Sequence, residues 1–209
     1  MPSSLVNQFL PVFDVSDELA LVVDAPPERV WATLMDVDLM EVGRRRPLVG
    51  LLGALRGLPE LVGQLLHGER PAALPERLTL RGIPEHPREG AGWTLLGELA
   101  GEEIALGLIG KFWRPRIEYA SVEPDAFRDF TAPGYAKTVY ALGVSPLAQG
   151  RTLLWAVMRT GTTDETARQW FRRYWTYGVG SGAHVVVNGV LDVVREAAEA
   201  PPPTGPAEE

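Results

Sequence analysis

The last third of the chain, from Arg151 to Glu199, constrains the fold more than any other stretch. Residues 151–162 alternate apolar and polar side chains, which predicts a strand with two distinct faces. A long and largely apolar segment follows, and Thr162 with Glu165 three residues later forms a capping-box pattern for its start. A helix with so much apolar surface must lie across another apolar surface. The rest of the chain therefore has to supply a sheet large enough to receive it.

This terminal helix carries a heavy aromatic stripe and an interruption. Trp170, Phe171 and Tyr174 recur at helical spacing, and three glycines fall within residues 178–182. Glycine is a poor helix former, so we expect a break there, with Ser181 capping a second helix over residues 185–198. The pattern predicts a long, kinked C-terminal helix.

Earlier segments supply the strands and a helical insert. Proline in the first turn and Glu28 predict a helix that begins at Pro26 and ends near Val37. A leucine-rich insert at 44–75, led by three arginines, is expected to form helices over 47–57 and 59–67. Alternation predicts strands over residues 18–24, 76–83, 92–100, 102–113, 126–132, 135–145 and 151–162, with a hairpin turn at Gly101.

The length suits one domain with a substantial core. We expect that domain over residues 1–199, with an N-terminal arm at 1–17 that lies on the body, and a disordered tail at 200–209 that is rich in proline. The opening strand and helix, with Ala-Pro-Pro-Glu-Arg-Val-Trp at residues 25–31, resemble the start of the START-like, helix-grip superfamily. That superfamily includes polyketide cyclases and dehydrases, pollen allergens and lipid-transfer domains.

The resemblance implies an α+β fold with a hydrophobic cavity. Its curved antiparallel sheet of about six or seven strands would wrap round the C-terminal helix, and the cavity would lie between them. Two features depart from the superfamily: the insert at 44–75 is longer than usual, and the C-terminal helix is interrupted. Both bear on the entrance to the cavity.

The alternation of residues 135–145 and 151–162 indicates which side chains face that cavity. Lys137 and Arg159 share one face, so we expect the other face inward. The opposite phase would make these two residues anchors for an anionic ligand. The candidate ligand-binding residues are Leu106, Leu108, Phe112, Thr138, Tyr140, Ala156, Met158, Thr160, Trp170 and Tyr174.

Several function classes are not expected. A net charge of −7 disfavours nucleic acid as a partner, because phosphate binding needs a basic surface. The chain has no cysteine, and its three histidines are far apart in sequence, so neither a metal site nor a cofactor is predicted. The glycine-rich residues 178–182 lack the preceding strand and following Lys-Ser/Thr of a phosphate loop. No leader peptide or membrane-spanning run is visible, so a cytoplasmic location is expected.

Two functions stay open from the sequence, and no catalytic residue is assigned. The first is a binding protein or carrier that encloses a lipid, a polyketide or an isoprenoid-like molecule. The second is a cofactor-free polyketide cyclase, aromatase or dehydratase, in which the Tyr140 hydroxyl and a threonine guide a ketone substrate. The insert at 44–75 is expected to be a lid over the cavity, a plain cover of the core, or a peripheral membrane contact through residues 44–66. Trp155 on the outer face is a candidate for packing by the arm or for a homodimer contact.

Overall fold

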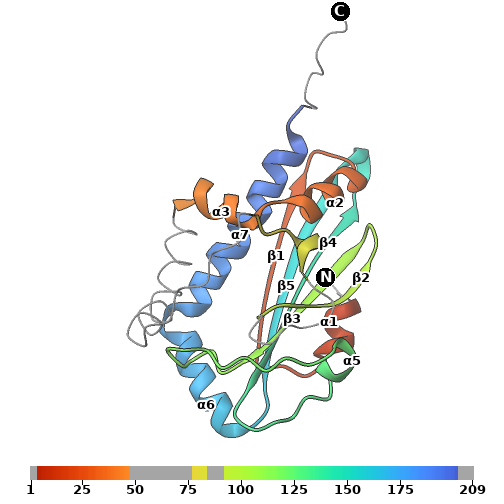
Figure 1. Ribbon diagram of the computed structural model, residues 1–209. Helices are drawn as coiled ribbons and strands as arrows, with labels where there is room; N and C mark the ends of the chain where they lie inside the picture. The colour runs from red at the N-terminus through yellow and green to blue at the C-terminus, as the bar shows by residue number, and fades with distance from the viewer. Residues whose placement is uncertain (1–3, 48–76, 84–91, 202–209) are drawn as a thin grey trace, which may run out of the picture.

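The computed structural model describes residues 4–47, 77–83 and 92–201. A five-stranded antiparallel sheet with the order β1-β5-β4-β3-β2 forms its centre (Figure 1). The strands are β1 (Val15–Val23), β2 (Thr94–Leu99), β3 (Glu103–Gly110), β4 (Ala136–Pro146) and β5 (Thr152–Thr162). Gly101, at φ 81°, turns the chain between β2 and β3, as the sequence predicts.

Helices lie on both faces of this sheet. The α-helices are α1 (Ser4–Phe9), α2 (Pro27–Asp36), α3 (Leu39–Arg45), α5 (Pro124–Phe127), α6 (Glu165–Tyr174) and α7 (Gly180–Glu199). Short 3₁₀ turns occur at Leu80–Gly82 and Ala148–Gly150, and a π-helical turn, Trp175–Val179, joins α6 to α7. No helix in the described ranges is long and apolar enough to cross a membrane.

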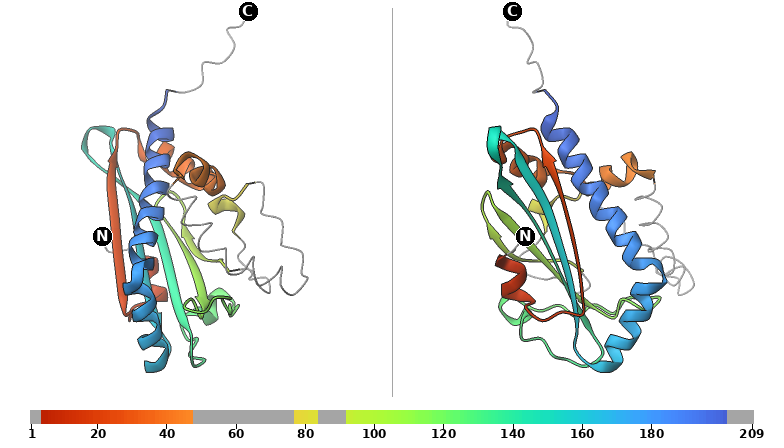
Figure 2. Two further views of the ribbon diagram at one scale, coloured as in Figure 1. Left: turned by 90° about the vertical axis from the view of Figure 1, so that its left-hand side faces the viewer. Right: turned by 180° about the vertical axis from the view of Figure 1, so that it is seen from behind.

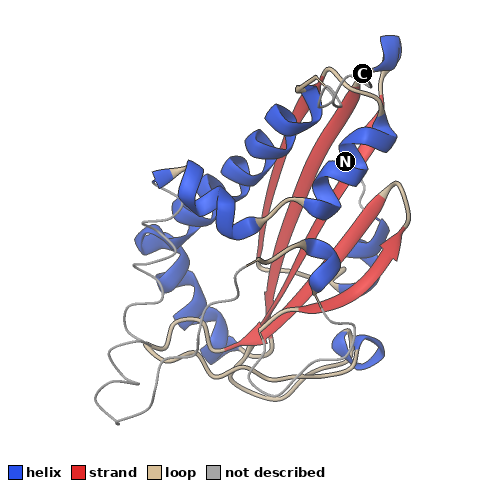
Figure 3. Ribbon diagram, turned by 45° about the horizontal axis from the view of Figure 1, so that its top comes forward, coloured by secondary structure: helices blue, strands red, loops and turns tan. Residues whose placement is uncertain are grey.

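We call the face toward α2 and α7 the inner face, and the face toward α1 and α5 the outer face (Figures 2 and 3). Alternate residues of each strand supply the two faces, because successive side chains point to opposite sides. The inner core contains Val23, Ile104, Leu106, Leu142, Val144, Leu154 and Ala156 from the strands, with Val30, Leu34, Leu191 and Val194 from the helices. The outer core contains Ala105, Val139, Ala141, Trp155 and Val157, with Leu5, Val6, Phe9 and Phe127 above them.

This arrangement is the expected α+β helix-grip architecture, but it has fewer strands. Residues 77–83, from the predicted strand at 76–83, instead form a loop and a 3₁₀ turn, because that turn sends both Leu80 and Ile83 into the inner core. The predicted strand at 126–132 was also wrong. Pro124 begins the short helix α5, and Phe127 packs between that helix and the outer face.

The leucine-rich insert begins differently from the prediction. Arg44 and Arg45 do not open a helix; they end α3, which Asp38 caps by accepting a hydrogen bond from the amide of Met40 at 3.0 Å. Both arginines pair with Glu41 one turn earlier. The predicted helices at 47–57 and 59–67 lie outside the described residues, apart from Pro47.

The C-terminal helix bends but does not break. The predicted interruption is a π-helical turn, and the helix continues through it into α7, so Ser181 starts no second helix (Figure 2). The helix start also differs. Asp164 is the N-cap and accepts a hydrogen bond from the Ala167 amide at 2.8 Å. Thr162 ends β5 and donates its hydroxyl to Asp14 instead.

Lys137 and Arg159 have hydrogen-bond partners on the outer face of the sheet. Both lie there, but α1, α5 and the chain around them cover this face, so neither side chain is fully in water. Lys137 donates to the carbonyl of Arg128 at 2.7 Å, and Arg159 donates to the side-chain oxygen of Asn7 at 2.7 Å. The alternative in which these two cations bind an anionic ligand on the inner face is therefore wrong.

Candidate functional site

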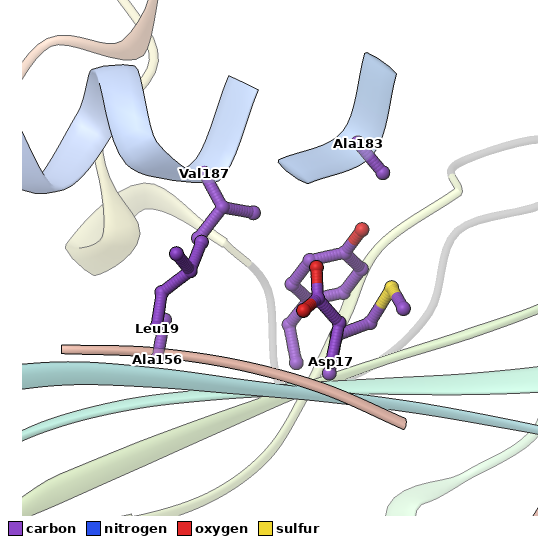
Figure 4. A pocket seen from close by; sticks show the side chains of 7 residues that line it. Asp17, Leu19, Ala156, Ala183 and Val187 are labelled. Atoms are coloured by element: carbon purple, nitrogen blue, oxygen red, sulfur yellow. The ribbon is translucent and has the colours of Figure 1, made fainter. Parts of the chain in front are cut away.

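A small cavity lies between the inner face and the first turns of α7 (Figure 4). Asp17, Leu19 and Ala156 point from the strands toward the helix, and Ala183 and Val187 point back toward the strands. The full lining is Asp17 and Leu19 from β1, Tyr140 from β4, Ala156 and Met158 from β5, and Ala183 and Val187 from α7. Its volume is about 10 Å³, close to the least that holds one water molecule.

Tyr140 is the polar group in the apolar wall of this cavity. Its ring packs edge-on against Trp93, with 5.4 Å between the ring centroids. Burial, with smaller contributions from the charges of Asp17 and Tyr174, raises the pKa of the phenol to about 12. The hydroxyl forms no hydrogen bond with any residue in the described part of the chain. Tyr140 is therefore a protonated donor at neutral pH, held where a carbonyl or hydroxyl oxygen could accept its bond.

Asp17 forms the second polar feature of the cavity. Its carboxylate lies 2.9 Å from Nδ1 of His184 in the first turns of α7. The pair joins the edge strand β1 to the helix, beside the π-helical turn that bends the helix. The Asp17 side chain is 29 % exposed and that of His184 is 49 % exposed, so water reaches the pair. Asp17 therefore lines the cavity that contains Tyr140, whereas His184 contacts Asp17 and is not part of the lining.

Two threonines satisfy each other farther along the inner face. The hydroxyls of Thr138 and Thr160 lie 2.9 Å apart across β4 and β5, and both side chains are buried. A buried hydroxyl without a partner would be costly, so this mutual bond explains how two polar groups fit an apolar face. It also means that each hydroxyl already has a partner before any ligand binds.

A larger hollow lies at the β2 side of the inner face. It has a volume of about 350 Å³ and opens to solvent. Its lining consists of Met35 from α2, Leu80, Arg81 and Ile83 from the 3₁₀ turn, and Leu95, Glu98 and Ile104 from β2 and β3. Five of these side chains are apolar, and Arg81 and Glu98 are charged. This volume lies within the range of about 300–1,000 Å³ that is usual for small-molecule sites, and polar atoms supply more of the surface of the hollow than apolar atoms do.

The hollow and the cavity lie along the same inner face of the sheet. Ile104 lines the hollow and pairs with Leu142, while Leu106, two residues along β3 on the same face, pairs with Tyr140. Leu106 therefore lies between the two spaces. No group of histidines and carboxylates in the described ranges is arranged to hold a metal ion.

The structure brings most, but not all, of the sequence-predicted site residues together. Tyr140, Ala156 and Met158 line the cavity, and Leu106 and Leu108 pair with Tyr140 and Thr138 across β3 and β4. Phe112 and Tyr174 belong to a separate aromatic cluster around Phe171 at the end of the sheet. Trp170 does not join them: it is 49 % exposed on the far side of α6.

Sequence reasoning missed the contribution of β1. Asp17 lies two residues before Leu19 on the same face, but the predicted strand began at Glu18 and excluded it. Extending the alternation of Leu19, Leu21 and Val23 backwards by one step would have found it. Ala183 and Val187 carry no sequence signal of their own, because small apolar residues are common in any packed helix.

The chain matches no protein-family model. It also matches no curated protein. Among solved structures, protein CV1439 from Chromobacterium violaceum is 15 % identical with a TM-score of 0.37, covering 89 % of this chain and 98 % of that one. The ZhuI aromatase/cyclase from Streptomyces sp. R1128 is 15 % identical with a TM-score of 0.33, covering 89 % and 96 %. Ara h 8.0201 is 9 % identical with a TM-score of 0.24, covering 87 % and 98 %. Each likeness concerns the fold alone.

Proposed function

We propose that this protein binds a hydrophobic small molecule, of lipid, polyketide or isoprenoid type, along the inner face of the sheet. The observation that carries the proposal is the hollow of about 350 Å³, which is walled by Met35, Leu80, Ile83, Leu95 and Ile104. Burying apolar ligand surface against such walls contributes about 25 cal/mol per Å². The charged rim offers Arg81 and Glu98 to a polar end of the ligand.

Tyr140 extends this site inward. A ligand that reaches past Leu106 would meet a phenol that donates a hydrogen bond and stays protonated, since its pKa is about 12. The cavity at Tyr140 holds about 10 Å³, so a ligand group there must displace the first turns of α7. The π-helical turn before α7 is where such a displacement would be absorbed.

The test is a titration of the full-length protein with the apolar dye anilinonaphthalene sulfonate, followed by displacement with a fatty acid. Ile83→Trp fills the hollow and should weaken dye binding at least about tenfold, which is about 1.4 kcal/mol. Leu147→Trp is the matched control, because Leu147 is 37 % exposed and lies outside the hollow. Failure of the wild-type protein to bind either compound, or equal loss in both variants, would contradict the proposal.

A second candidate is a cofactor-free cyclase or dehydratase acting on a poly-β-ketone. The observation that favours it is that Asp17 and Tyr140 line one cavity, with Nδ1 of His184 lying 2.9 Å from the Asp17 carboxylate. The imidazole would remove a proton from the methylene between two carbonyls. The phenol would donate a hydrogen bond to the enolate oxygen that results.

Turnover of a model β-polyketone separates the two candidates. Tyr140→Phe and His184→Gln should each lower kcat by about two orders of magnitude while dye binding is retained. Leu147→Ala is the control, because Leu147 is exposed and lines neither the cavity nor the hollow. If the wild-type protein has no turnover, or neither variant changes it, the protein acts as a carrier only.

A further inference from the structure

The outer side of α6 and the π-helical turn presents large aromatic side chains to solvent. Trp170 is 49 % exposed and Tyr177 is 86 % exposed. The opposite side of the same segment already carries Phe171, Tyr174 and Trp175 in the aromatic cluster that joins it to the sheet. Attachment to the sheet is therefore provided without Trp170 and Tyr177. Trp170 and Tyr177 are about two helical turns apart, so both can contact one external surface.

Arginines surround these aromatic side chains. Residues 165–177 contain three arginines and one glutamate, whereas the whole chain has a net charge of −7. Arg168 is paired with Asp14 and Glu165, at 2.8 and 2.7 Å. Arg172 and Arg173 form no ion pair with any described residue, and the Arg173 guanidinium lies 5.5 Å from the centre of the Trp170 ring. The docking surface, defined as Trp170, Arg172, Arg173 and Tyr177, is thus locally basic on an acidic protein.

We infer that this docking surface binds peripherally to membranes that contain anionic phospholipids. Tryptophan and tyrosine prefer the headgroup level of a bilayer, where an apolar ring and a polar tip are both satisfied. Arginines near the membrane surface attract anionic headgroups, and each one makes the free energy of membrane binding more favourable. Both groups come from α6 and the π-helical turn, at the end of the molecule where β5 leads into α6 (Figure 2).

Charge complementarity favours a membrane over a nucleic acid. A planar anionic surface can approach one end of the molecule without contacting the rest of the chain, which carries the net negative charge. A nucleic-acid strand that passed beyond the docking surface would meet that acidic remainder. The inference goes beyond the proposed ligand binding and does not depend on it, because docking requires no cargo.

The experiment is co-sedimentation of the full-length protein with vesicles, without any added ligand. The protein should bind vesicles of equimolar phosphatidylcholine and phosphatidylglycerol, should not bind phosphatidylcholine alone, and should dissociate as salt is raised. Arg172→Glu/Arg173→Glu should weaken binding more than about tenfold. Trp170→Ala should weaken it several-fold at unchanged charge.

The control variant is Arg128→Glu/Arg151→Glu, which changes net charge by the same amount on exposed arginines outside α6. It should bind vesicles like the wild-type protein, and all variants should retain dye binding in the hollow. The inference is overturned if the wild-type protein ignores anionic vesicles, or if the control loses as much binding as the test variant. It is also overturned if single-stranded oligothymidylate, but not vesicles, binds through Arg172 and Arg173.

Discussion

Burial of Tyr140 on the inner face should make the stability of the fold depend on pH in the alkaline range. The folded protein holds the phenol at a pKa of about 12, whereas a tyrosine in an unfolded chain has a pKa of about 10. The folded state therefore binds the extra proton between these two values. The contribution to stability is complete below about pH 10 and is lost as pH rises toward about 12.

We expect Tyr140→Phe to remove this dependence. Urea unfolding at about pH 9 and about pH 11.5 should show the wild-type protein losing about 2 kcal/mol more than the variant over that interval. Other tyrosines and lysines titrate equally in both proteins, so the difference between the two isolates Tyr140. Parallel losses in the two proteins would mean that the phenol ionises as freely in the folded state as in the unfolded one.

Position 143 in β4 requires glycine because neighbouring atoms approach its Cα closely, and not because of an unusual backbone angle. A methyl group at this position would lie 2.5 Å from the carbonyl oxygen of Glu102 and 2.7 Å from Cε2 of Trp155. The indole of Trp155 lies over the glycine on the outer face and donates to Ser145 at 3.2 Å. A side chain at 143 must displace either the hairpin backbone or this ring.

Gly143→Ala should therefore destabilise the protein by about 2 kcal/mol or more. Gly82→Ala is the matched control, since a methyl group there would approach Thr79 Oγ1 no closer than 3.5 Å. The measurement is the midpoint of urea unfolding for both variants. A Gly143→Ala protein as stable as the control would show that the indole moves aside at little cost.

At the scale of elements, alternation was enough to predict β1, β2, β3, β4 and β5. It also assigned the inner and outer faces of β4 and β5, because the charged residues Lys137 and Arg159 lie on the same face of the sheet. It failed at 76–83 and 126–132. Apolar residues three positions apart pack into the core there, from a 3₁₀ turn in the first segment and next to a short helix in the second. A short apolar run fits both the periodicity of a strand and that of a helix, so its tertiary contacts determine which structure it forms.

The candidate site was less predictable than the fold. The inner face was correctly located, but the volume left beside Tyr140 depends on how Ala183 and Val187 of α7 pack against it. Periodicity does not determine the rotation of a helix over a sheet. The aromatic stripe illustrates the same point: Phe171, Tyr174 and Trp175 pack in the aromatic cluster at the end of the sheet, and Trp170 turns outward.

Gly180 allows the ring of Trp175 to pack against the start of α7, directly after the π-helical turn. The Trp175 ring lies where a methyl group on Gly180 would be, with Cε2 at 2.7 Å and Nε1 at 2.8 Å. The same ring stacks on Phe171, with 5.8 Å between centroids. A glycine is therefore required for the indole to pack along the helix surface.

Helix propensity alone predicts that Gly180→Ala stabilises the helix by about 1 kcal/mol. We expect the opposite sign, because the methyl group must displace the indole from Phe171. Near-ultraviolet circular dichroism should show a changed tryptophan environment, and urea unfolding should show lower stability. A more stable variant with an unchanged spectrum would contradict this role of Gly180.

Asp164 connects the start of α6 to the turn before β4. It accepts hydrogen bonds from the amides of Ala167 and Gly134, and these bonds hold the pKa of its carboxyl group below the usual range of an aspartate. The stability it contributes is complete above the unfolded-state pKa. It is lost as pH falls through the lower pKa of the folded state.

Asp164→Asn should therefore reduce the acid sensitivity of the protein. Acid titrations followed by far-ultraviolet circular dichroism should show a shallower loss of stability below about pH 4 in the variant. Glu165→Gln serves as the control, because it removes an exposed neighbouring carboxylate without touching the cap. Equal acid midpoints in wild-type protein and Asp164→Asn would exclude this role for the cap.

At the scale of the whole molecule, the sheet is covered on both faces by segments from opposite ends of the sequence. Helix α1 covers the outer face through Leu5, Val6 and Phe9, and α7 covers the inner face. The covered outer face includes Trp155, which is only 6 % exposed. An uncovered face of this kind would be a large apolar patch.

A charge on the buried side of α1 should expose that patch. Val6 is 0 % exposed, so Val6→Asp should cost about 3 kcal/mol or more and increase dye binding at the outer face. Gln8→Asp places the same carboxylate on the exposed side of the same helix and should change stability by less than about 0.5 kcal/mol. Similar unfolding midpoints for the two variants would mean that α1 adds little to the fold.

The position of β1 has a consequence for how the chain is made. Among the described residues this strand is at the edge of the sheet and pairs with β5 alone, so Val15 lies opposite Thr160. During synthesis β1 leaves the ribosome early and must wait for nearly the entire sheet to follow. Until then its apolar residues Leu19 and Leu21 have no strand to pair with, and such distant pairings form slowly. The complete sheet can therefore form only after the synthesis of β5, which lies more than 120 residues later in the chain.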